Sequence, residues 1–282
     1  SCRRSLRGPT APQLVGMNPR AFLNTLSNKN YTLPIVILYV TEACNLKCIM
    51  CSYRDRLPDE LTLDEIRELA VELKKFGLGK IVYSGGEPLL RKDLPDICGL
   101  FSDLCVKQTL LTNGLLLAKR IGDVAQFLDE LIISIDGANP NVHNEIRGIN
   151  SFDTITNAIP LFKKANAHAS VSLRTVVQKM NFRQIPDIIE LGLDLKVDGV
   201  SFLAVDVFSE AFARKRQPPN GQGELLLTPA EVRELREIIL SLSKNKAGLF
   251  ASRFISESVG RLMKIADYFE ALTNGRPFPR VY

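Results

Sequence analysis

The stretch Cys44-Asn45-Leu46-Lys47-Cys48-Ile49-Met50-Cys51 holds three cysteines in the spacing C-x3-C-x2-C. It follows the apolar run 35–41 (IVILYVT), which predicts a buried parallel strand. The cysteines are therefore expected on a loop just past the carboxyl end of a strand, where α/β folds place their ligands. Three thiolates can hold three irons of a [4Fe–4S] cluster and leave the fourth iron open. A zinc site completed by Cys98 or Cys105 is the alternative.

Apolar runs alternate with helical patterns along the rest of the chain. The expected strands are 35–41, 80–84, 106–111, 130–135, 170–178 and 199–205. Helical periodicity fills most of the intervals between them, and two further helices are expected at about 228–242 and 256–272. The strings TLDE (62–65) and TPAE (228–231) each predict a capped helix start. This order predicts one parallel sheet with right-handed crossovers and too few strands for a closed eight-stranded barrel.

Polar or glycine-rich breaks come at the ends of the first four expected strands. They are the cysteine loop and the strings SGGEP (84–88), TNG (112–114) and SIDG (134–137). The carboxyl ends of parallel strands share one rim, so these breaks predict a composite binding site. Gly85 and Gly86 would let the backbone approach a ligand closely, and Pro88 biases Glu87 toward an extended conformation.

Three further polar positions are candidates for the same rim. Ser134 and Asp136 are two residues apart on a strand and should point to one face, where they suit ribose hydroxyls. Arg174 is a lone charge in an apolar strand, so we expect it to meet an anion; pairing with Glu87 or Asp136 is the alternative. Thr112 and Asn113 lie near this rim, although Asn113-Gly114 also suits a plain turn.

Composition limits the class of protein. The chain has 282 residues and a mild net charge of +5, and no apolar run approaches the roughly 20 residues that span a bilayer. Residues 1–41 hold five basic and no acidic residues. We interpret this as an extension packed on the barrel, rather than a targeting or nucleic-acid-binding arm. The six cysteines do not suit a disulfide framework; Cys98 and Cys105 are expected to be small buried hydrophobes, and a cytoplasmic location follows.

The cysteine loop after the first strand, together with Gly85-Gly86-Glu87-Pro88 after the second, resembles the radical S-adenosylmethionine (radical SAM) superfamily. The resemblance covers about residues 33–205 and implies an α/β fold, a partial (β/α)6 TIM-like barrel of parallel strands, followed by C-terminal helices. It divides the chain into an irregular extension (1–32), a core barrel (33–205) and a loop with a helical segment (206–282). It also implies a [4Fe–4S] cluster on Cys44, Cys48 and Cys51, with SAM as the second cofactor.

The same resemblance assigns roles around SAM. The Gly-Gly-Glu-Pro string would receive its amino group, Ser134 its ribose and Arg174 its carboxylate, while Met50 and Leu203 or Ala204 would contact the adenine. The full set of expected cofactor-binding residues is Met50, Gly85, Gly86, Glu87, Pro88, Thr112, Asn113, Ser134, Asp136, Arg174 and Leu203. His143 and Arg147 match a stretch that is frequent in the SPASM branch, and a surface helix face is the other interpretation.

The resemblance implies reductive cleavage of SAM to a 5′-deoxyadenosyl radical, which abstracts hydrogen from a peptide or small molecule. A low-potential electron donor such as flavodoxin or ferredoxin would be needed. Ile37 stands where the molybdenum-cofactor cyclase of this branch has an arginine, which argues against that activity. No cysteine follows Cys105, so the chain as given cannot build an auxiliary cluster. The alternative function is a non-catalytic iron–sulfur module, which would have no use for Gly85-Gly86-Glu87-Pro88.

Overall fold

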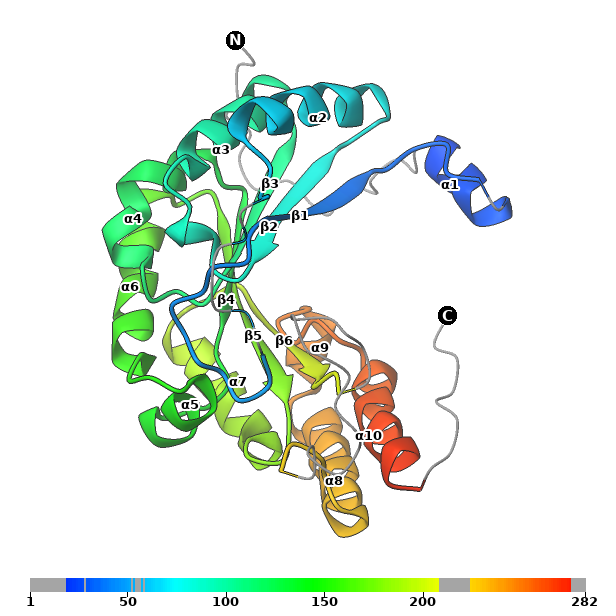
Figure 1. Cartoon of the computed structure of the whole chain (residues 1–282). Helices are drawn as coiled ribbons and strands as arrows, with labels where there is room; N and C mark the ends of the chain where they lie inside the picture. The colour runs from blue at the N-terminus through cyan, green and yellow to red at the C-terminus, as the bar shows by residue number, and fades with distance from the viewer. Residues whose placement is uncertain are drawn as a thin grey trace.

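The chain forms one curved, six-stranded parallel sheet whose strands follow the order of the sequence (Figure 1). A computed structural model describes residues 19–27, 29–51, 53, 57, 59–207 and 224–274. The strands are β1 (Ile35–Thr41), β2 (Lys80–Gly85), β3 (Lys107–Thr112), β4 (Glu130–Ser134), β5 (Ser170–Val177) and β6 (Gly199–Ala204). Within the described residues β1 and β6 are the two edges of this open sheet, and Ile255 adds an isolated bridge to Val200 of β6. The predicted partial barrel is confirmed.

Helices connect successive strands and cover the convex face of the sheet (Figure 1). They are α2 (Leu63–Lys75), α3 (Leu94–Asp103), α4 (Leu117–Val124), α5 (Pro140–Arg147), α6 (Phe152–Ala165) and α7 (Ile185–Asp194), with short 3-10 turns η1 (Pro88–Leu90), η2 (Ala125–Phe127) and η3 (Phe182–Gln184). Helix α1 (Pro19–Leu26) precedes β1, and α8 (Pro229–Asn245), α9 (Ala247–Ala251) and α10 (Val259–Thr273) follow β6. Among the described residues no helix has the length and hydropathy needed to cross a bilayer.

Both predicted helix caps are present, and each is a capping box. The Thr62 and Thr228 side chains accept from the N3 backbone amides of Glu65 and Glu231, and both glutamates bond back to the cap residue. The predicted helical region 139–166 consists of two helices, because Gly148 adopts a left-handed φ of 70° at the end of α5. This break turns the chain so that the end of α5 reaches the loop after β1.

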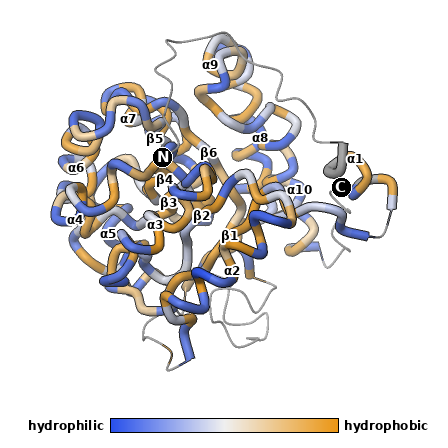
Figure 2. Tube along the Cα trace, turned by 90° about the horizontal axis from the view of Figure 1, so that it is seen from above, coloured by the Kyte–Doolittle hydropathy of each residue, from blue (hydrophilic) through white to orange (hydrophobic). Residues whose placement is uncertain are grey.

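The alternation of side chains along each strand separates the core from the concave face. In β5, Val171, Leu173 and Val177 are buried under the helices, while Ser172 and Arg174 face the other way and are partly exposed. Figure 2 shows the apolar strands gathered at the centre of the molecule, with mixed hydropathy along the surrounding helices. The concave face and its rim are therefore left for a site.

Candidate functional site

Cys44, Cys48 and Cys51 lie on the loop after β1, as predicted, and all three are free thiols. Cys48 is buried, and the other two are half-buried. Burial raises the pKa of both the Cys44 and Cys48 thiols, and repulsion from neighbouring cysteines raises each further. The three sulfurs are therefore close enough to influence one another's charge.

The zinc alternative has no support in the described part of the chain. There, no three His, Cys, Asp or Glu side chains converge on a position for one metal ion. Cys98 is 1% exposed in the apolar core, as predicted. Cys105 does not fit its prediction: it is exposed and disulfide-bonded. It lies past the end of α3 at a left-handed φ of 52°, off the helix face that packs on the sheet. A [4Fe–4S] cluster binds each thiolate at a separate iron, so it does not need ligands that converge on one ion.

The loop after β2 packs directly on the cysteine loop. Gly86 N donates to Thr41 O and Glu87 N donates to Ala43 O, both at 2.8 Å. A Cβ at Gly85 would lie 2.1 Å from Thr41 O, and one at Gly86 would lie 2.2 Å from Ala43 O. The two glycines are predicted to let the backbone approach a ligand; in the structure their close neighbours are Thr41 and Ala43, just before Cys44.

Glu87 is extended, with φ −139° and ψ 106°, as the following Pro88 predicts. Its carboxylate is fully buried and accepts from Leu89 N at 3.0 Å, Thr112 Oγ1 at 2.7 Å and Asn113 N at 2.7 Å. Burial raises the pKa of Glu87, and these donors oppose the shift. The side chain thus ties the rim of β2 to the rim of β3.

Asn113 extends this connection to the cysteines. Its Nδ2 donates to Asn45 Oδ1 at 2.8 Å and lies 4.0 Å from Cys44 Sγ, within reach of a hydrogen bond to sulfur. Its Oδ1 accepts from Leu115 N at 3.0 Å, and Gly114 has a φ of 79°. The turn that Asn113-Gly114 predicts is therefore present, and the Asn113 side chain also contacts the cysteine loop.

Asp136 is fully buried and bonded within the protein. Its Oδ1 accepts from Val176 N at 2.8 Å, and its Oδ2 lies 2.7 Å from Arg147 Nη2. Ser134 is half-buried, and in the sheet it is paired with Arg174. The two residues therefore have different surroundings. The Asp136 carboxylate is bonded to Val176 N and Arg147, whereas Ser134 lies beside Arg174 on the concave face.

Arg174 does not pair with Glu87 or Asp136, so the structural alternative for this residue is wrong. Its Nε donates to Ser201 Oγ at 3.2 Å, and its charge acts on Glu130 and Glu257. Glu130 already binds Lys80 Nζ at 2.6 Å. The guanidinium of Arg174 is half-buried on the concave face, next to Ser134.

His143 and Arg147 are buried, at 0% and 7% exposure, so the interpretation as a surface helix face is wrong. Asp136 N donates to His143 Nδ1 at 3.2 Å, which makes Nε2 the protonated nitrogen, facing Ser151 Oγ at 3.2 Å. Burial lowers the pKa of His143 to about 3, so the ring is neutral at physiological pH. Their spacing of four residues puts both on one face of α5, a signal that a search for buried helix faces could have used.

Met50 and Leu203 frame the rest of the rim. Met50 is half-buried against the core, next to Cys51 in the chain. Leu203 is 45% exposed on β6, paired in the sheet with Val176. Both side chains are apolar, so their contacts alone do not separate a role in ligand binding from a role in packing.

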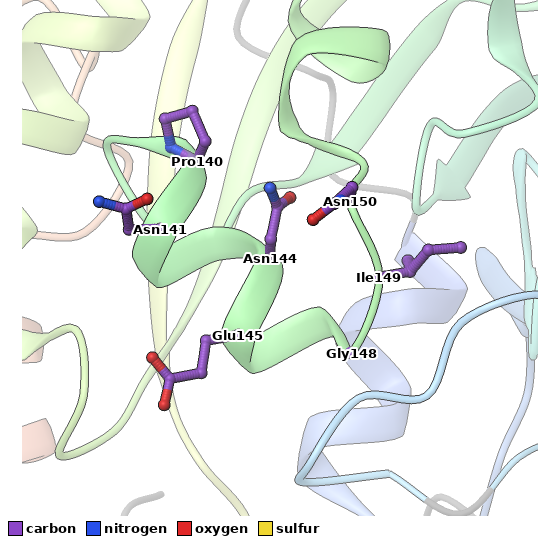
Figure 3. Close-up of a pocket in the computed structure, with 7 residues that line it drawn as sticks. All are labelled: Pro140, Asn141, Asn144, Glu145, Gly148, Ile149 and Asn150. Atoms are coloured by element: carbon purple, nitrogen blue, oxygen red, sulfur yellow. The ribbon is translucent and has the colours of Figure 1, made fainter.

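A surface cavity of about 480 Å³ lies elsewhere, around α5 and the turn that follows it (Figure 3). Its lining residues are Pro140, Asn141, Asn144, Glu145, Gly148, Ile149 and Asn150. None of them is among the expected cofactor-binding residues. Asn144 Oδ1 accepts from the Ser151 and Phe152 amides, so this side chain caps α6.

The family model of the Radical SAM superfamily matches residues 38–192, and the chain belongs to this family. The chain is 30% identical over 177 residues to Fe-coproporphyrin III synthase of Methanosarcina barkeri, covering 60% of this chain and 43% of that protein. It is 28% identical over 185 residues to PqqA peptide cyclase of Bradyrhizobium diazoefficiens (64% and 48%). It is 34% identical over 168 residues to a probable GTP 3′,8-cyclase of Methanocaldococcus jannaschii (55% and 54%). The chain thus spans about half the length of the curated relatives it matches.

Solved structures share the fold. Streptococcus suis SuiB bound to its precursor peptide SuiA superposes with a TM-score of 0.62 at 18% identity, covering 81% of this chain and 50% of that chain. The structure of anSMEcpe with bound AdoMet and the Cp18Cys peptide also gives 0.62, at 19% identity, covering 79% and 63%. At these identities the likeness extends to the fold alone.

Proposed function

We propose that this chain is the barrel of a radical SAM enzyme. When bound, a reduced [4Fe–4S] cluster would supply the electron that cleaves SAM to methionine and a 5′-deoxyadenosyl radical, which takes hydrogen from a peptide or small-molecule substrate. The observation that carries the proposal is the arrangement at the rim. Three free thiols lie on a loop that two backbone hydrogen bonds hold against Gly86 and Glu87.

The donor set fits the cluster. Cys44, Cys48 and Cys51 would hold three irons and leave the fourth iron open. Asn113 Nδ2, at 4.0 Å from Cys44 Sγ, would hold that thiolate by a hydrogen bond. The rigid rim formed through Glu87 would keep the three sulfurs in place before the cluster binds.

SAM would bind between the cysteine loop and the concave face. The backbone of Gly85, Gly86 and Pro88 would take its amino group, and Ser134 its ribose. Arg174 is our candidate for its carboxylate, because a fork of N–H donors suits a carboxylate and, within the part of the chain that the structure describes, Ser201 alone accepts from it. Thr112 would position this site indirectly, through its hydrogen bond to Glu87. Asp136 would do so through its contacts with Arg147 and Val176. Met50 and Leu203 would flank the adenine.

The substrate would reach the site along the concave face. Ile35, Ile37 and Tyr39 on β1 are 58%, 58% and 53% exposed and give this edge an apolar character. This apolar edge leads us to favour a peptide or apolar substrate over GTP. Relatives that include a peptide cyclase, and the structure of SuiB with a peptide, support this choice.

We propose the division into an extension (1–32), a barrel (33–205) and a C-terminal segment (206–282). The activity of the whole protein also requires a low-potential electron donor, such as flavodoxin or ferredoxin. Although Cys105 is disulfide-bonded, an open iron is labile to oxygen, and we therefore propose that the protein works in the cytoplasm.

Anaerobic reconstitution with iron and sulfide, followed by an assay for 5′-deoxyadenosine with SAM and dithionite, tests the proposal. The wild-type chain and Cys98→Ala, which changes a buried core thiol, should both form the product, and Cys48→Ala should form none. A stable, reducible cluster that never cleaves SAM would instead favour the non-catalytic iron–sulfur module.

A further inference from the structure

The carboxyl end of α5 is fixed to the cysteine loop by its backbone. Lys47 N donates to Arg147 O at 3.2 Å, and Ile49 N donates to Ile146 O at 3.0 Å. Gly148 packs so closely that a Cβ there would lie 2.5 Å from Lys47 O. These contacts flank Cys48 on both sides, so any residue on this end of α5 is held in a defined place relative to its thiol.

Arg147 uses that place to contact two charged or chargeable groups. Its Nη2 lies 2.7 Å from Asp136 Oδ2, and its Nη1 lies 3.9 Å from Cys48 Sγ, within the range of a hydrogen bond to sulfur. Asp136 is held from its other side by Val176 N and, through its own backbone amide, by His143. The carboxylate balances the buried guanidinium and aims it at the cysteine loop.

The hydrogen bonding of this group is incomplete. Arg147 is 93% buried, and among the described residues its Nε meets no hydrogen-bond acceptor. Asp136 Oδ2 contacts the guanidinium, but no described donor forms an aligned hydrogen bond to it. Buried donors are nearly always satisfied. The guanidinium that reaches Cys48 Sγ through Nη1 thus keeps a further N–H, at Nε, for an acceptor.

We propose that Arg147 is a positioning residue for the iron–sulfur cluster: it donates to the Cys48 thiolate and stabilises the reduced state of the cluster. The inference rests on the proposed function, which supplies the cluster. One-electron reduction adds negative charge to the cluster, and a fixed cation with N–H donors stabilises that charge. Lysine would keep the charge but cannot bond Asp136 and Cys48 with one planar fork.

The test is a redox titration of the anaerobically reconstituted full chain, followed by electron paramagnetic resonance (EPR). The variants are Arg147→Gln, Arg147→Lys and the charge-neutral pair Asp136→Asn/Arg147→Gln. Arg236→Gln is the matched control, because that guanidinium pairs with Asp267 and Glu270 between α8 and α10, far along the chain from the cysteines. Iron content, circular dichroism and thermal unfolding are measured for each variant.

We expect Arg147→Gln to lower the equilibrium constant for reduction of the cluster at least tenfold, which lowers its reduction potential by about 59 mV for one electron. Arg147→Lys should lower the potential by less, and Arg236→Gln should leave it unchanged. The double variant should also shift, because the N–H donors to sulfur are lost. A folded Arg147→Gln protein that loses iron supports the positioning role. The reduction potential is then measured on Arg147→Lys instead. An unchanged potential and iron content in the folded Arg147 variants would overturn the inference. A wild-type chain that binds no [4Fe–4S] cluster would instead refute the proposed function.

Discussion

Replacing Gly86 by alanine should separate the two loops that build the site. The added Cβ would lie 2.2 Å from Ala43 O and 2.5 Å from Glu42 O, both backbone atoms that no side-chain rotation can move. Ordinary contact requires more than 3 Å, so one loop must retreat by about an ångström. Gly86 has no positive φ, so the effect is purely steric.

The retreat breaks the hydrogen bonds from Gly86 N to Thr41 O and from Glu87 N to Ala43 O, both 2.8 Å long. Each contributes about 1 kcal/mol, and leaving its groups unpaired costs about 1–3 kcal/mol, so we expect a loss of about 2–4 kcal/mol in the free energy of unfolding. Iron binding by the cysteine loop should fall as well, because the loop loses the surface that holds it.

Gly99→Ala is the matched control, because it makes the same chemical change inside α3, where the new Cβ meets nothing within 4 Å. Removing a helix-interior glycine should raise stability by about 0.5–1 kcal/mol. Urea denaturation of the apoprotein at pH 7 measures both variants. A Gly86→Ala protein as stable as Gly99→Ala, with full iron content, would refute the packing described for this rim.

Three other outcomes are expected. Glu87→Gln places an amide NH2 among groups that donate to the carboxylate in the wild type. It should lower the free energy of unfolding by about 2–3 kcal/mol in urea denaturation and reduce iron content. Wild-type stability would show that Glu87 does not tie the strands together. The pKa of His143 falls from 6.5 to about 3 on folding, so the unfolded chain takes up the proton first as the pH drops. Unfolding at pH 5.5 should therefore need about 1 kcal/mol less than at pH 7 from this group, and His143→Gln should lack that difference; equal slopes would contradict the buried neutral ring. Arg174→Met should weaken SAM binding at least tenfold by calorimetry while changing stability by less than about 1 kcal/mol, and unchanged affinity would remove Arg174 from the site.

The sheet could be predicted from the sequence because most of its strands contain apolar runs bounded by polar or glycine residues. The same boundaries placed the cysteine loop and Glu87 at one rim. The sequence could not say which rim carboxylates serve the protein itself. Glu87 meets Asn113 and Asp136 meets Arg147 only after folding, and no local pattern records these contacts.

Arg147 shows this limit most clearly. Its i, i+4 relation to His143 indicates a shared helix face, but only the crossing of α5 under the cysteine loop brings its guanidinium to Cys48. Cys105 was misjudged for a related reason. It follows the apolar face of α3 in the sequence, but the left-handed turn there directs its side chain out of the core.

The most direct test of the account is EPR spectroscopy of the reconstituted, reduced chain, recorded with and without SAM. A cluster held by three cysteines should give about four irons per chain and a spectrum that changes when SAM is added, because one iron has no cysteine ligand. Each of Cys44→Ala, Cys48→Ala and Cys51→Ala should abolish the signal, while Cys98→Ala should preserve it. A cluster whose spectrum ignores SAM, or one iron or zinc ion in place of a cluster, would contradict the account.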